Sequence, residues 1–162
     1  MTTSLDECRI PYFAYGSNME RAGMTERCPG ARFVSTAVLD GHVFLVNRNH
    51  HGTVLPAAGR RVHGVLWSIT PDDRARLDEY EGVELALYRR HEVHVVAGDG
   101  RSVDALSYMA RNTEPTRTSG PYFESLLAAA RALAFPPEYL SELEGWRAAD
   151  AWEQGNPGTR RG

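Results

Sequence analysis

The strongest candidate for a reactive side chain in this sequence is Glu81, which lies where a predicted helix gives way to a loop. A carboxylate at a helix C-terminus meets the negative end of the helix dipole, which favours its neutral form. Partial burial acts in the same direction, so both effects raise the pKa of the carboxyl group. A general base that works near neutral pH needs such a pKa. The alternative is a solvated acidic patch that Glu81 shares with Asp78 and Glu79, in which Asp78 is spaced to pair with Arg74.

The second candidate is a short aromatic stretch near the start of the chain, Tyr12-Phe13-Ala14-Tyr15-Gly16-Ser17-Asn18-Met19. Its first half has the composition of a buried strand, and Gly16 permits a sharp turn. Ser17 followed by Glu20 fits a capping box, so we predict that a helix begins at Ser17 or Asn18. The unpaired N–H groups at such a point attract anions and carbonyl oxygens. We interpret the stretch as one wall of a small-molecule pocket; the alternative is a helix cap and nothing more.

Other polar side chains give weaker signals. Tyr88 and Tyr108 lie in strand-like segments and Tyr122 begins a helical one, but a buried tyrosine is more commonly a core residue with one satisfied hydroxyl. Ser17 lacks the GxSxG context of a serine nucleophile. The six histidines show no metal-ligand spacing, and no dinucleotide or phosphate-binding motif is present. We therefore predict neither a metal nor a cofactor.

Composition favours one globular domain, because 162 residues with 42% hydrophobic and 24% charged side chains suffice for a single core. The net charge of -3 argues against a nucleic-acid partner. The sequence has no apolar stretch long enough to span a membrane and no signal peptide. Its two cysteines form no motif, so we predict a cytoplasmic protein with reduced thiols. Arginine replaces lysine throughout, which we attribute to a GC-rich bacterial genome and which excludes lysine Schiff-base catalysis.

The elements that must position these residues are strands and helices in mixed order. We predict strands at residues 10–15, 32–39, 42–46, 61–69, 87–97 and 102–110, and helices at 18–27, 71–82, 121–133 and 139–146. Residues 48–59 are predicted to be an irregular loop. Two hairpins, with turns at Asp40-Gly41 and at residues 98–100, argue against an all-parallel sheet. The prediction is an α+β domain at residues 10–147, built as a small, mixed, partly closed β-barrel of about six strands with peripheral helices. A flexible segment, residues 1–9, precedes it, and a disordered tail, residues 148–162, follows.

Three motifs together resemble those of a known family. They are the stretch from Tyr12 to Met19, the segment Leu77-Asp78-Glu79-Tyr80-Glu81-Gly82-Val83 followed by Tyr88, and Ser107-Tyr108-Met109. They resemble the γ-glutamylcyclotransferases, an AIG2-like or butirosin-maturation-like superfamily, over roughly residues 11–146. The resemblance implies a compact α+β barrel with a cavity. It also implies release of 5-oxoproline from a γ-glutamyl amide without metal or cofactor.

Residue by residue, the resemblance assigns the catalytic glutamate to Glu81. It assigns substrate contacts to Tyr12, Phe13, Ala14, Tyr15, Gly16 and Ser17, with Asn18 beside them, and to Tyr88, Tyr108 and Tyr122. The implied partner is a small γ-glutamyl molecule whose leaving group is an amino acid, an amine or a natural product. Two alternatives stay open, a serine-dependent amide hydrolase that uses Ser17 and a non-catalytic module that binds a glutamyl-like ligand. The choice between monomer and homodimer also stays open.

Overall fold

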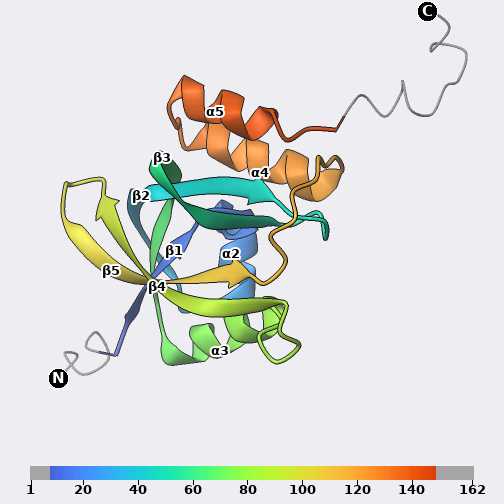
Figure 1. Ribbon diagram of the computed structural model, residues 1–162. Helices are drawn as coiled ribbons and strands as arrows, with labels where there is room; N and C mark the ends of the chain where they lie inside the picture. Colours follow the sequence, from blue (N-terminus) through green and yellow to red (C-terminus); the bar gives the residue numbers. More distant parts are fainter. Residues whose placement is uncertain (1–7, 149–162) are drawn as a thin grey trace, which may run out of the picture.

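The computed structural model describes residues 8–148 of the chain, and within them five strands form a closed barrel (Figure 1). Neighbours around the barrel follow the order β1-β3-β2-β4-β5. All neighbouring pairs are antiparallel except β1 and β5, which run parallel and close the barrel. The strands are β1 (Ile10–Ala14), β2 (Arg32–Val46), β3 (Gly52–Ile69), β4 (Tyr88–Ala97) and β5 (Ser102–Ala110). The predicted mixed α+β barrel is therefore confirmed, but it is closed where we expected it to be partly closed, and it has five strands in place of about six.

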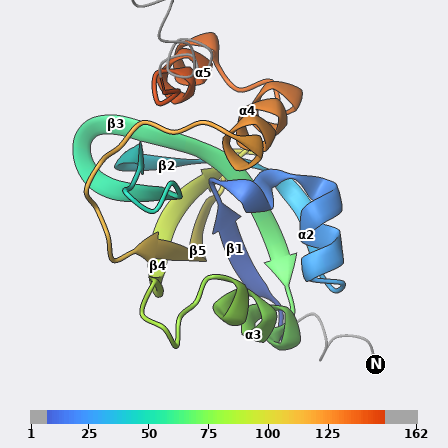
Figure 2. The same cartoon turned by 90° about the vertical axis from the view of Figure 1, so that its right-hand side faces the viewer.

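Helices cover the two ends of this barrel. They are the 3-10 turn η1 (Ser17–Met19) and the helices α2 (Arg21–Arg27), α3 (Pro71–Tyr80), α4 (Pro121–Ala132) and α5 (Pro137–Glu144). Both views place α4 and α5 at one end of the barrel and α3 at the other (Figure 2). The predicted start of α3 is confirmed, because the Thr70 hydroxyl accepts a hydrogen bond from the Asp73 N–H at 3.1 Å. This capping box fixes where α3 begins.

The helix predicted to begin at Ser17 or Asn18 is split in two, and Ser17 does not cap it. The turn η1 comes first and has no side-chain cap. Helix α2 is capped by Glu20 itself, whose carboxylate accepts from the N–H groups of Ala22 and Gly23 at 3.1 and 2.7 Å. A carboxylate at this position also suits the positive end of the helix dipole. The sequence correctly indicated a capped helix start in this segment, but the cap is the Glu20 carboxylate and not the Ser17 hydroxyl.

The hairpin predicted at Asp40-Gly41 is wrong, since β2 continues through it. The register between β2 and β3 shifts between Asp40 and His42, as at a β-bulge. Gly41 has a φ of 72° there, a backbone conformation that both a tight turn and a bulge use and that glycine adopts without strain. The same dipeptide therefore bends one long strand where we expected two short ones.

The irregular loop predicted at residues 48–59 is also wrong, because β3 begins at Gly52. The turn of the β2–β3 hairpin is short, and the Asn47 N–H donates to the His51 carbonyl oxygen at 2.9 Å. Pro56 is tolerated because this half of β3 pairs with β2 alone, while β1 pairs only with residues 65–69. Proline is acceptable on a strand segment with one free edge.

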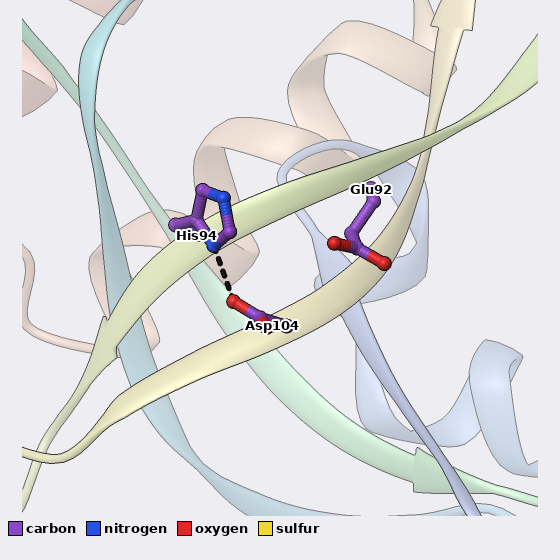
Figure 3. Close-up of side chains that lie close together, drawn as sticks. All are labelled: Glu92, His94 and Asp104. Atoms are coloured by element: carbon purple, nitrogen blue, oxygen red, sulfur yellow. Dashed lines mark hydrogen bonds and ion pairs between the residues drawn. The ribbon is translucent and has the colours of Figure 1, made fainter.

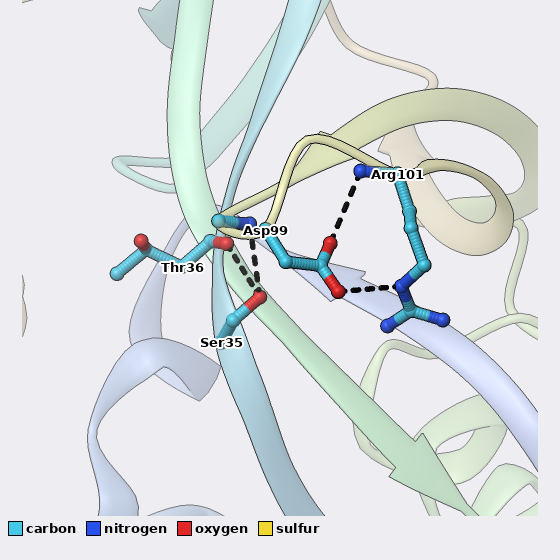
Figure 4. A network of polar contacts seen from close by, with 5 residues as sticks. Ser35, Thr36, Asp99 and Arg101 are labelled. Carbon is cyan, nitrogen blue, oxygen red and sulfur yellow. Dashed lines mark hydrogen bonds and ion pairs between the residues drawn. The ribbon is translucent and has the colours of Figure 1, made fainter.

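The β4–β5 hairpin, by contrast, is confirmed, and its turn is tied to β2 (Figure 4). The Gly98 N–H donates to Ser35 Oγ at 3.2 Å, and Ser35 Oγ donates to the Thr36 carbonyl oxygen at 2.7 Å. Within the turn, the Asp99 carboxylate accepts from the backbone N–H and from Nε of Arg101 at 3.0 and 2.6 Å. The bond from Gly98 to Ser35 attaches the turn of the hairpin to β2. The first residues of β4 and the last residues of β5 lie at the other end of the hairpin.

The predicted flexible segment and tail lie almost wholly on residues 1–7 and 149–162, outside the described residues, so the domain boundaries stay a prediction. Between residues 8 and 148, no helix has the length and apolar character needed to cross a membrane. The predicted cytoplasmic location stays a prediction as well.

Candidate active site

A cavity of about 220 Å³ opens beside the turn that follows β1. Its walls come from β1, η1, the end of α3, the start of β4, β5, the β2–β3 turn and α4. The lining residues are Tyr12, Tyr15, Gly16, Ser17, Asn18, His51, Gly52, Tyr80, Glu81, Leu87, Tyr88, Ser107, Tyr108 and Tyr122. Among the predicted site residues, Phe13 and Ala14 do not line it but are buried in the barrel core. The fold thus brings segments from both halves of the chain to one hollow.

Asn18 fixes the shape of the turn after β1. Its side-chain amide donates to the Tyr12 hydroxyl at 2.9 Å, and its amide oxygen accepts from Arg27. Its backbone oxygen accepts from Trp67 Nε1 at 3.0 Å. Because Asn18 is buried and these polar groups are all bonded within the protein, it positions the backbone of the turn and of Tyr12.

The tyrosine hydroxyls of the cavity are held by backbone groups. Tyr15 donates to the carbonyl oxygen of Tyr108, and Tyr88 donates to that of Gly52 at 2.6 Å. The Tyr122 hydroxyl instead accepts from the Gly52 N–H at 3.4 Å. Burial raises the pKa of Tyr122 to about 12 and also raises the pKa values of Tyr15 and Tyr88. These side chains are neutral, fixed walls. Because residues 48–59 were predicted to be an irregular loop, the sequence did not indicate that the Gly52 backbone bonds Tyr88 and Tyr122. No local sequence pattern signals this role.

Asp78 lies inside a polar cluster and not on a solvated helix face. Arg90 Nε donates to its Oδ1 at 2.8 Å and Arg90 Nη2 to its Oδ2, while the Tyr108 hydroxyl donates to Oδ1 at 2.6 Å. The Arg90 bond is the main reason that the pKa of Asp78 is lowered. The expected hydrogen-bonded pair with Arg74 is replaced by this one, because Arg90 and Tyr108 are cross-strand neighbours on β4 and β5.

Glu81 is the C-cap residue of α3, and its backbone N–H donates to the Leu77 carbonyl oxygen at 2.8 Å. The residue is partly exposed at the cavity mouth, but its carboxyl group is enclosed by protein. Burial raises the pKa of this carboxyl to about 7, and the charge of Arg27 only partly opposes the shift. Within residues 8–148 no hydrogen bond holds the carboxylate. The predicted rise in pKa is confirmed, and such a group accepts and returns protons near neutral pH.

One cluster of possible metal ligands lies outside the cavity, on the exposed face of the β4–β5 hairpin (Figure 3). His94 and Asp104 are cross-strand partners and are hydrogen-bonded, and Glu92 lies two residues along β4 on the same face. Their ligand atoms lie within 4.8 Å of one another. Sequence reasoning did not bring them together, because the strand register decides which side chains meet. The expectation of a protein without metal or cofactor stays a prediction.

Known proteins share this architecture. The model of the AIG2-like family matches residues 61–143. The γ-glutamylcyclotransferase of Homo sapiens is 30% identical over 152 residues, which cover 88% of this chain and 81% of the human protein. This chain belongs to the AIG2-like family.

Solved structures agree with this membership of the AIG2-like family. A γ-glutamyl cyclotransferase matches the chain with a TM-score of 0.80 at 28% identity, covering 88% of this chain and 90% of that one. YkqA of Bacillus subtilis matches with a TM-score of 0.73 at 28% identity, covering 89% of this chain and 56% of that one. The resemblance to the γ-glutamylcyclotransferase-like superfamily is thereby confirmed, and the AIG2-like chain is an enzyme of the cyclotransferase type.

Proposed function

We propose that this enzyme releases 5-oxoproline from a γ-glutamyl amide, with Glu81 as general acid and base. The observation that carries the proposal is the Glu81 carboxyl, which lines the cavity and has a pKa raised to about 7 by burial. A group with this pKa divides between its two protonation states near neutral pH, as proton transfer in both directions requires. The relatives that carry the name γ-glutamylcyclotransferase support the substrate class.

In the proposed reaction, Glu81 first takes a proton from the α-ammonium group of the substrate. The amine then attacks the γ-carbonyl carbon of the same molecule, so that a C–N bond closes a five-membered ring and the carbonyl oxygen becomes negative. Protonated Glu81 next gives its proton to the amide nitrogen, and the new ring nitrogen loses its second proton to solvent. The original C–N bond breaks, the carbonyl double bond re-forms, and 5-oxoproline and the free amine leave. Because the attack is intramolecular, much of the rate enhancement comes from holding the glutamyl chain folded.

The polar groups of the cavity suit a substrate with one positive and one negative group. Tyr15, Tyr88 and Tyr108 each donate their hydroxyl proton to a protein acceptor. Each therefore offers a ligand an oxygen lone pair, which matches an ammonium group. The Tyr122 hydroxyl accepts from Gly52 and keeps its own proton, which matches a carboxylate or an oxyanion.

The turn after β1 supplies further donors near Tyr122. The first hydrogen bond of η1 runs from the Met19 N–H to the Gly16 carbonyl oxygen at 3.0 Å. The N–H groups of Ser17 and Asn18 precede that bond and are not used within the turn. A Cβ placed on Gly16 would lie 3.5 Å from the Tyr122 hydroxyl, so these donors and Tyr122 border the same space. We assign them to the substrate carboxylate or to the oxyanion that forms during ring closure.

A hydrolase that uses Ser17 is less well supported. Ser17 Oγ lies 3.3 Å from the Tyr80 hydroxyl, which is not the adjacent imidazole or amine base that activates a hydroxyl nucleophile. Within the described part of the chain, no histidine is hydrogen-bonded to Ser17 to activate it. A module that only binds its ligand gains nothing from an enclosed carboxyl with a raised pKa.

Mass spectrometry of the products tests the proposal. Wild type, Glu81→Gln and Ser17→Ala are incubated with a panel of γ-glutamyl amino acids and γ-glutamyl amines. We expect 5-oxoproline with wild type and with Ser17→Ala, and none with Glu81→Gln. Free glutamate that disappears with Ser17→Ala would establish the hydrolase instead. Ligand binding without any product would establish the binding module.

A further inference from the structure

The lining of the cavity changes in character from its floor to its mouth. Tyr12, Asn18, Ser107 and Tyr108 are almost fully buried and carry hydroxyl or amide groups. At the mouth, Tyr80 is 46% exposed and Leu87 is 49% exposed. Leu87 is the one aliphatic side chain among the described residues that line the cavity. We call Tyr80 and Leu87 the apolar lip.

The protein holds Leu87 in this position. Its N–H donates to the Gly82 carbonyl oxygen at 3.1 Å, and its own carbonyl oxygen accepts from the Arg111 N–H at 3.1 Å. Gly82 has a φ of 67°, and a Cβ there would come within 2.9 Å of Leu87 Cδ1. The loop therefore folds tightly back on itself directly after Glu81. A large aliphatic group is fixed beside the catalytic carboxyl and half-exposed to water.

We infer that the apolar lip contacts the leaving group and makes the enzyme prefer γ-glutamyl amides whose amine carries an apolar side chain. The inference rests on the proposed function. The γ-glutamyl part carries two charged groups and fits the polar floor, so the group on the other side of the scissile bond extends to the mouth. An apolar side chain there covers exposed surface of Leu87 and Tyr80, which is favourable.

The test measures kcat/KM for the γ-glutamyl derivatives of glycine, alanine, leucine and aspartate. We expect wild type to prefer the leucine over the glycine derivative by about tenfold, the effect of a few methylene groups in a partly open apolar site. Leu87→Ser should remove most of this ratio, and Leu87→Ala should remove part of it. Leu85→Ser is the matched control, because Leu85 lies on the same loop, is 77% exposed and is not among the lining residues. This control should keep the wild-type ratio.

Each outcome decides the inference. A wild type without preference for the leucine derivative overturns it, whatever the variants do. A ratio that survives both Leu87 substitutions also overturns it. If Leu87→Ser leaves the ratio intact but changes the oligomeric state, the lip is an interface between copies of the chain. If all four derivatives yield 5-oxoproline without preference, the specificity inference fails and the proposed function stands. If none yields 5-oxoproline, the proposed function fails, and the specificity inference that rests on it fails with it.

Discussion

Two neighbouring regions at the end of α3 hold carboxyl groups whose pKa values are shifted in opposite directions. Asp78 faces the β4–β5 hairpin, where Arg90 and Tyr108 bond it and lower its pKa. Glu81, three residues later, faces the cavity, where burial raises its pKa to about 7. Both lie at the negative end of the same helix dipole, so the dipole does not produce the difference. The difference shows that partners and burial, supplied by other segments, decide which carboxylate is structural and which is reactive.

The largest expected effect is the loss of turnover with Glu81→Gln, which keeps the shape of the side chain but cannot accept a proton. We expect kcat to fall by about 10²- to 10⁴-fold, the usual contribution of general acid–base catalysis. A steady-state assay of 5-oxoproline release measures it, with a thermal melt to show that the variant is folded. Glu79→Gln, two residues away and exposed, is the control and should keep wild-type kcat. Equal losses of kcat in both variants would show that Glu81 has no catalytic role that Glu79 lacks.

The second effect is a pH dependence of stability that differs in sign between the two carboxyls. Glu81 has a pKa raised from 4.5 to about 7 in the folded state, so it contributes stability below pH 4.5 that is lost as the pH rises through about 7. Asp78 has a lowered pKa, so its contribution is present above its ordinary value of 3.8 and is lost as the pH falls. At 1.36 kcal/mol per pKa unit, the Glu81 contribution is at most about 3 kcal/mol.

Urea denaturation of wild type and Glu81→Gln, from about pH 5 to about pH 8, measures this effect as a free energy of unfolding. The difference between the two proteins should shrink or reverse as the pH rises, because only wild type must bury a charge. A difference that is constant over this range would show that the Glu81 carboxyl is not buried as the cavity geometry indicates.

The third effect concerns Asp78→Asn, which removes the charge from the polar cluster. We expect the free energy of unfolding to fall by about 1 to 2 kcal/mol, since charge-assisted hydrogen bonds to Arg90 and Tyr108 weaken. The figure is modest because the Arg90 side chain is 45% exposed. Chemical denaturation at neutral pH measures it, with the exposed Glu79→Gln again as the control. If Asp78→Asn is as stable as wild type, the cluster is not structural.

The smallest effect is that of Tyr108→Phe, which removes one hydrogen bond to Asp78 and leaves the Arg90 pair in place. The expected loss is about 1 kcal/mol of unfolding free energy. Tyr80→Phe is a suitable control, because its hydroxyl makes a longer bond, to Ser17, at an exposed site. If Tyr108→Phe loses more free energy of unfolding than Asp78→Asn, the tyrosine hydroxyl stabilises the cluster more than the Asp78 charge does.

Much of the fold was predictable because its signals are local. Thr70 and Pro71 mark the start of α3, and the polar turn at residues 98–100 marks the β4–β5 hairpin; both predictions hold. Predictions failed where one local signal serves two structures. The Asp40-Gly41 pair suits a bulge as well as a turn, and the polar residues after Asn47 form a short turn and the start of a strand. Which outcome occurs depends on the partner strand, which no local window contains.

The candidate site likewise contains some residues that the sequence indicated and others that only the tertiary structure revealed. Glu81 and the turn after β1 were found from motifs and from the resemblance. Leu87 and Gly52 were not, because nothing in their own neighbourhood sets them apart. Leu87 matters as the single aliphatic side chain among the described residues that line the tyrosine-rich cavity, and Gly52 because its backbone bonds Tyr88 and Tyr122. Both facts depend on contacts between segments that are distant in sequence.

The amino-acid sequence by itself determined the family, the start of α3 and the presence of a carboxylate where α3 stops. The tertiary structure alone decided that Asp78 meets Arg90 and Tyr108 while Glu81 meets a cavity. The physical reason is that capping and strand alternation act over a few residues. A pKa, in contrast, follows the charges, hydrogen bonds and solvent within a few ångströms, and here closure of the barrel brings those together.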